Sequence, residues 1–97
     1  MRQNKDETAR VLHEVLDERE RQEARWGQQN HDLPRYFAIL SEEVGEVAKA
    51  IVEHEFTSDD LRRGLFLLEV RHELVQTAAV AVAMVERIDR QMGAGAA

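Results

Sequence analysis

The chain has 97 residues, of which 43% are hydrophobic and 33% are charged, a length typical of one domain. It contains no cysteine, which excludes a disulfide scaffold, a zinc ribbon and a thiol nucleophile and favours the cytoplasm as its compartment. The formal net charge of −6 argues against nucleic acid and anionic membranes as partners. With five glycines and one proline, the composition predicts a single all-α domain over residues 1–97, frayed at 1–6 and 93–97.

The first predicted helix runs from about Glu7 to Arg25. Its apolar residues recur four apart and form one stripe on an otherwise charged rod. They are Val11, Leu12, Val15 and Leu16. The polar stretch 27–32 that follows is typical of a loop.

The second predicted helix extends from about Asp32 to Glu55, because Asp32 can cap its start and Pro34 suits a first turn. Most of its apolar residues lie within one arc, which we expect to be the buried face. They are Phe37, Leu40, Val44, Val47, Ala48 and Ile51.

The third predicted helix begins after Ser58 or Asp59 and reaches about Gln91, with a kink or a split possible at Gly64. Residues 74–85 are apolar on every side apart from Gln76 and Thr77, so other helices must surround them. The run is too short for the ~20 residues of a transmembrane helix. We therefore expect a bundle of three to four helices per chain that is completed by oligomerisation.

Three carboxylates, Glu42, Glu43 and Glu46, lie close together on the second helix. Helical geometry places Glu43 at the border of the apolar arc and Glu46 one turn further along, where like charges repel. One interpretation is a solvated acidic face, with Lys49 paired to Glu46 or Glu53. Gly45 argues against it, because a glycine inside a helix costs ~1 kcal/mol and is useful where a backbone or a ligand comes close.

The third helix repeats this spacing with Glu73 and Gln76. Glu73 directly precedes the apolar run, where an ionised carboxylate needs either a salt bridge or a metal ion. Arg63 and Arg71 are the available salt-bridge partners. Oxygen ligands from two packed helices suit magnesium or manganese and are poorly suited to zinc. The candidate ligands are Glu43, Glu46, Glu73 and Gln76.

The segments ILSEEVGEVAKAI (39–51) and HELVQTAAVAVAMVERIDR (72–90) resemble the MazG-like family of all-α nucleoside triphosphate pyrophosphohydrolases, whose signature is EExxE followed by ExxD. The preceding RWGQQNHDLP (25–34) is also similar, so the resemblance covers roughly residues 20–90. It implies an oligomeric helical bundle, a homodimer or a dimer of dimers, that uses Mg²⁺ or Mn²⁺ to cleave a nucleoside triphosphate into monophosphate and pyrophosphate.

By motif position the metal ligands are Glu43, Glu46 and Glu73, while the last position of ExxD is Gln76. An amide oxygen can bind magnesium but adds no charge, so the site has three carboxylates where the family pattern has four. The alternative is a catalytically weakened or inactive oligomeric module of the same fold that binds nucleotide or another protein.

The implied reaction suggests roles for four further residues. Glu42 is the candidate to orient or deprotonate the attacking water, and Lys49 can contact phosphate unless it pairs with a glutamate of its own helix. Trp26 can stack on the nucleobase, or it can anchor the polar loop on the core. His31 can contact base or phosphate, or it has no role.

Overall fold

The computed structural model describes residues 2–93, with side chains from Asn4 onward, and every regular element in this range is an α-helix. Helix α1 spans Arg2–Trp26, α2 spans Leu33–Phe56 and α3 spans Asp60–Gln91. The prediction of an all-α chain is therefore confirmed. The fraying predicted for 94–97 concerns residues outside the described range.

The helix caps follow the predicted chemistry. The side chain of Asp32 accepts a hydrogen bond from the backbone N–H of Arg35 at 2.9 Å, and proline occupies the first turn of α2. Asp59 caps α3 in the same way, accepting from the N–H of Leu61 at 3.0 Å. Between α1 and α2, Gly27 has a φ of +73°, a left-handed conformation that glycine adopts without strain.

Two helix boundaries differ from the prediction. Helix α1 begins at Arg2 instead of near Glu7, because its first turns are polar residues of good helix propensity that produce no apolar periodicity. Helix α3 runs without interruption through Gly64, so the possible kink does not occur. One glycine costs about 1 kcal/mol, which a helix of 32 residues can absorb.

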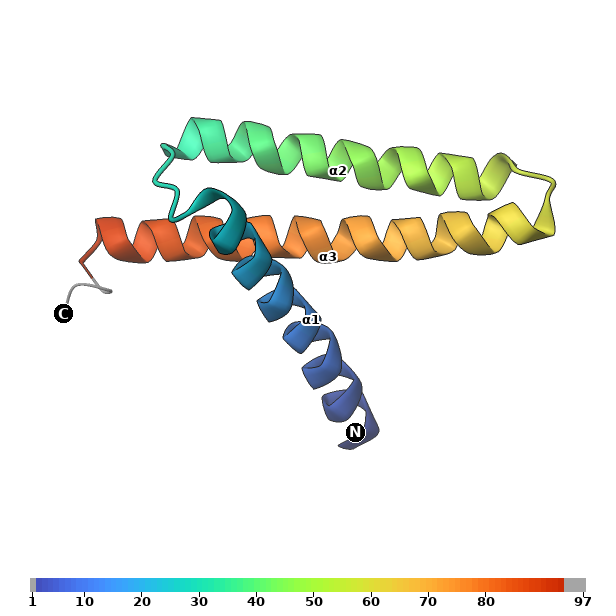
Figure 1. The fold of residues 1–97 in the computed structure, drawn as a ribbon, viewed down its shortest axis with the longest axis horizontal. Coiled ribbons are helices and arrows are strands. Elements are labelled where there is room, and N and C mark those ends of the chain that lie inside the picture. The colour runs from blue at the N-terminus through green and yellow to red at the C-terminus, as the bar shows by residue number, and fades with distance from the viewer. Residues whose placement is uncertain (1, 94–97) are drawn as a thin grey trace.

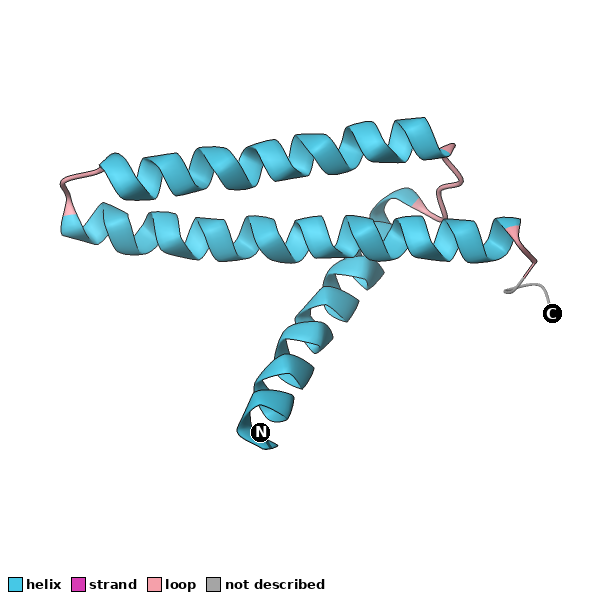
Figure 2. Ribbon diagram, turned by 180° about the vertical axis from the view of Figure 1, so that it is seen from behind, coloured by secondary structure: helices cyan, strands magenta, loops and turns pink. Residues whose placement is uncertain are grey.

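Helices α2 and α3 form a long antiparallel hairpin, and α1 crosses α3 at a steep angle (Figure 1). The first half of α1 projects away from the hairpin, which contributes to overall dimensions of 53 × 36 × 23 Å. Seen from behind, α1 passes on the far side of α3, so it covers one face of the hairpin (Figure 2). In the described range no helix is long and apolar enough to cross a bilayer.

The core lies where α1 and α2 meet α3, and it is small. Its buried apolar members are Val15, Tyr36, Ala50, Ala79, Val80 and Ala83. The arc predicted to be the buried face of α2 is only partly covered: Leu40 and Val47 are half-buried, but Phe37, Val44 and Ile51 are 64%, 52% and 44% exposed. The hairpin instead turns the neighbouring arc of α2, with Tyr36 and Ala50, toward α3.

The exposed arc of α2 forms a continuous apolar stripe. Phe37, Val44 and Ile51 are seven residues apart, so they lie along one side of the helix. The apolar run of α3 is also incompletely covered, with Leu74 and Val85 more than half exposed. We refer to Phe37, Val44 and Ile51 as the open stripe.

Candidate functional site

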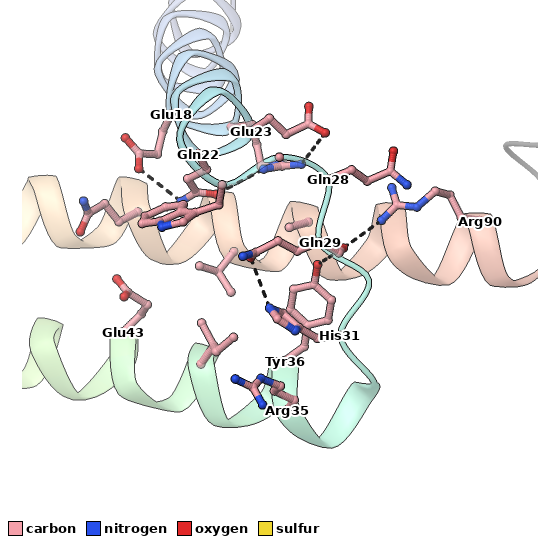
Figure 3. Close-up of a pocket in the computed structure, with 17 residues that line it drawn as sticks. Glu18, Gln22, Glu23, Gln28, Gln29, His31, Arg35, Tyr36, Glu43 and Arg90 are labelled. Carbon is pink, nitrogen blue, oxygen red and sulfur yellow. Dashed lines mark hydrogen bonds and ion pairs between the residues drawn. The ribbon is translucent and has the colours of Figure 1, made fainter.

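A pocket of about 340 Å³ lies where the end of α1, the loop 27–32, the first half of α2 and the second half of α3 come together (Figure 3). Four of the residues singled out from the sequence line it: Trp26, His31, Glu43 and Gln76. Its size is in the range of small-molecule sites, about 300–1,000 Å³.

Aromatic side chains and a fixed loop form one end of the pocket. The hydroxyl of Tyr36 donates to the backbone carbonyl of Gln29 at 2.8 Å, and the rings of Tyr36 and His31 meet edge to face at 5.1 Å. The loop is thus anchored by buried Tyr36. Trp26 is 56% exposed, with the guanidinium of Arg25 4.8 Å from the centre of its ring. Its indole therefore has free surface for another planar group.

Glu43 extends from α2 toward the end of α1 and is half-buried (Figure 3). Burial raises the pKa of its carboxyl group above the ordinary value, and the negative charges of Glu46, Glu42 and Glu18 raise it further, while His72 lowers it. No cationic side chain forms an ion pair with Glu43 in the described part of the chain.

Glu73 of α3 is in a similar environment. Burial raises the pKa of its carboxyl group, a hydrogen bond to Glu69 and the negative charges of Glu43 and Glu69 raise it further, and His72 lowers it. The influence of Glu43 on Glu73 means that the hairpin brings the carboxylates of the two motifs close together.

The two arginines considered as salt-bridge partners of Glu73 are engaged elsewhere. Arg71 binds Glu14 of α1 with both guanidinium nitrogens, at 2.8 Å for the Nη1 contact, and Arg63 donates to the backbone carbonyl of Thr57 at 2.8 Å. The salt-bridge interpretation of Glu73 is therefore wrong for both arginines.

The remaining predicted residues lie outside the pocket. Glu46 and Lys49 line a neighbouring hollow of about 390 Å³ on the hairpin, together with Glu53. Lys49 forms no ion pair among residues 4–93, so its predicted pairing with Glu46 or Glu53 is not observed. Glu42 is exposed and lines neither cavity. Gly45 has open space where a side chain would start, so no backbone of this chain approaches it.

The side chains partly fit a hard cation. Glu43 and Glu73 are partly buried carboxylates of like charge with no ion-pair partner in the described part of the chain. Glu43 and the amide of Gln76 line the pocket, whereas Glu73 does not. Such donors are those that Mg²⁺ prefers. Within residues 4–93, however, no three acidic, histidine or cysteine side chains are grouped as metal ligands.

Comparison of the chain with protein-family models, curated proteins and solved structures finds no match. Its chemistry is therefore inferred from the residues around the pocket.

Sequence reasoning missed the contribution of α1 to the pocket. Glu18 is 6% exposed, lies on the pocket wall beside Gln22, and its charge acts on Glu43. A signal was present, because Val15, Glu18, Gln22 and Trp26 follow one another at helical spacing. A stripe that starts apolar and becomes polar before an aromatic residue indicates a buried polar surface.

Proposed function

We propose that the protein hydrolyses a nucleoside triphosphate, with ribose or deoxyribose, to the monophosphate and pyrophosphate in the presence of Mg²⁺ or Mn²⁺. One observation carries this proposal. Glu43 and Glu73, on facing helices, are partly buried carboxylates without a cationic partner, and Glu43 lines a pocket that also exposes an indole ring. The resemblance of both motifs to the MazG-like signature supports the same reaction.

A chain with a net charge of −6 needs added positive charge to hold a polyphosphate. The residues that would hold a divalent ion are Glu43, Glu46, Glu73 and Gln76. When bound, such an ion would neutralise the negative charge on the phosphate oxygens.

The other predicted residues have separate tasks in this proposal. Trp26 stacks on the base, and His31 contacts base or phosphate from the loop. Glu42, exposed beside Glu43, orients the water or removes its proton. Lys49, which has no ion pair in the described part, contacts a phosphate.

We also propose that the active form is a homodimer or a dimer of dimers. The open stripe of Phe37, Val44 and Ile51 is a row of exposed large side chains on the face of a helix. Burying such side chains is favourable by about 1.5–3 kcal/mol each, and a second copy offers a matching surface.

One observation favours the second candidate, a nucleotide-binding module of low activity. Gln76 is uncharged at the position where the signature has a fourth carboxylate. A module of this kind would bind nucleotide and metal without turnover.

The test uses the full chain with each common NTP and dNTP, with Mg²⁺ or Mn²⁺, and measures pyrophosphate and orthophosphate separately. We expect pyrophosphate and the monophosphate in equal amounts. Glu73→Gln should abolish turnover, whereas Glu55→Gln, an exposed carboxylate at the end of α2 that lines neither cavity, should retain it. Release of orthophosphate alone would contradict the proposed reaction, and nucleotide binding without any product would favour the second candidate.

A further inference from the structure

The α1 wall of the pocket carries a chain of hydrogen bonds that ends on α3. Arg21 binds the Oε1 atom of buried Glu18, whose Oε2 accepts from the Nε2 of Gln22 at 3.2 Å. The Oε1 of Gln22 accepts from the Nη1 of Arg19 at 3.3 Å. Arg19 in turn donates to Glu86 Oε1 from Nε at 3.1 Å and from Nη2 at 2.6 Å.

This network holds the amide of Gln22 in one orientation (Figure 3). A flipped amide would place its NH₂ group against the guanidinium of Arg19 and its carbonyl against the carboxylate of Glu18, and both contacts are repulsive. In the observed orientation the NH₂ group of Gln22 donates one hydrogen bond and its carbonyl oxygen accepts one. Within the described part of the chain, one N–H and one carbonyl lone pair of Gln22 have no hydrogen-bond partner, and Gln22 lies on the pocket wall.

Gln22 lies four residues before Trp26, so their side chains are neighbours on the same side of α1. The pocket therefore presents a stacking surface and, one helical turn away, a paired donor and acceptor. A nucleobase has the complementary features, because its flat ring stacks on aromatic side chains and its edge carries adjacent hydrogen-bond donors and acceptors. We propose that Gln22 reads the hydrogen-bonding edge of the base and determines which bases the site accepts, an inference that rests on the proposed function.

The charges around Gln22 favour the base over the phosphates at this wall. Glu18 is paired with Arg21, and the guanidinium of Arg19 is paired with Glu86, so neither cation at this wall is left to bind a phosphate. The neutral amide suits an uncharged ring.

A fixed amide separates the bases into two classes. Adenine and cytosine place an amino donor beside a ring nitrogen acceptor, whereas guanine, uracil and thymine place a carbonyl acceptor beside a ring N–H. Because stacking on Trp26 and the direction of the phosphates fix how the base lies, one order of donor and acceptor fits and the other does not. We therefore expect the wild-type protein to prefer one class over the other by about tenfold or more.

The test compares kcat/KM for ATP, CTP, GTP and UTP in the full-length protein. Gln22→Met keeps the length of the side chain and should reduce the preference between the classes to about twofold or less. Gln22→Glu offers acceptors only and should shift the preference toward GTP, because guanine presents two adjacent donors, its ring N–H and its exocyclic amino group. Gln28→Met is the matched control, since Gln28 lines the same pocket without a hydrogen bond in the described part, and it should leave the preference unchanged.

Two results would overturn the inference. The first is a wild-type protein that turns over all four nucleotides equally, and the second is a Gln22→Met variant that loses activity on all four by the same factor. Melting temperatures with AMP, CMP, GMP and UMP provide a readout without turnover. Suppose that no triphosphate is cleaved, that the melting-temperature shifts differ between the two base classes, and that Gln22→Met equalises them. The proposed reaction then fails, but the role of Gln22 in base recognition stands. Equal melting-temperature shifts in the wild type refute that role.

Discussion

The contact between Arg19 and Glu86 connects the pocket-forming end of α1 to α3, so it offers a direct test of how the pocket is assembled. The side chain of Arg19 is 13% exposed and donates twice to Glu86 Oε1, at 3.1 and 2.6 Å. Arg19→Met keeps the apolar part of the side chain and removes both hydrogen bonds to Glu86, together with the one to Gln22. Hydrogen bonds to charged groups contribute about 1.5–3 kcal/mol.

The expected loss is smaller than this range suggests, because the side chain of Glu86 is 45% exposed and water can solvate it in the variant. We expect Arg19→Met to lower the free energy of unfolding by about 1–2 kcal/mol. For a domain of this size the melting temperature should fall by about 5–15 °C. Urea and thermal unfolding measure both quantities, at one protein concentration because association also affects stability.

A double-mutant cycle with Glu86→Gln isolates the pair, and the coupling energy should be about 1 kcal/mol. Arg71→Met is the comparison, since Arg71 and Glu14 are both solvent-exposed and their pair should contribute less. If Arg19→Met is as stable as the wild type and the cycle shows no coupling, α1 is not held on α3 by this contact, and the assembly of the pocket must be attributed to apolar packing alone.

Four further outcomes are expected. The folded-state pKa values of Glu43 and Glu73 are raised above 4.5, so the folded protein binds protons more tightly than the unfolded chain. Without metal, the free energy of unfolding should therefore fall as pH rises through these values. Urea unfolding of Glu43→Gln or Glu73→Gln should show a weaker decline with pH. Gln76→Asp should lower the melting temperature without metal and enlarge the increase on adding Mn²⁺; an identical metal response would show that Gln76 is not a ligand. Gly45→Ala should stabilise an isolated chain by about 1 kcal/mol, since the space around it is open, and destabilisation in the denaturant melt would indicate that a second copy contacts it. Val44→Asp should convert a dimer into monomers in sedimentation equilibrium, and a wild-type monomer at micromolar concentration would refute the proposed assembly.

Local sequence signals were sufficient for the helices and for part of the site. The caps at Asp32 and Asp59 and the apolar periodicity predicted the helical elements, since both depend on residues within one or two turns. The same locality predicted Glu43 at the border of a buried face, but the structure places it, half-buried, within the covered arc between Tyr36 and Ala50. Spacing along one helix is a local property, and the sequence contains it completely.

The pairing of helices depends on how they cross, and only the tertiary structure decided it. Helix α2 has two adjacent apolar arcs, and the hairpin covers the arc of Tyr36 and Ala50 while leaving Phe37 and Val44 exposed. Periodicity cannot choose between such arcs, because both are apolar and the choice depends on the partner helix.

Long-range polar contacts were equally beyond reach of the sequence. Arg71 lies two residues from Glu73 in the chain, yet it binds Glu14 across the crossing of α1 and α3. The same crossing brings Glu18 and Gln22 into the pocket beside Glu43. Each of these contacts joins residues far apart in the chain, so its existence depends on the angle and position at which α1 meets α3, which no local pattern encodes.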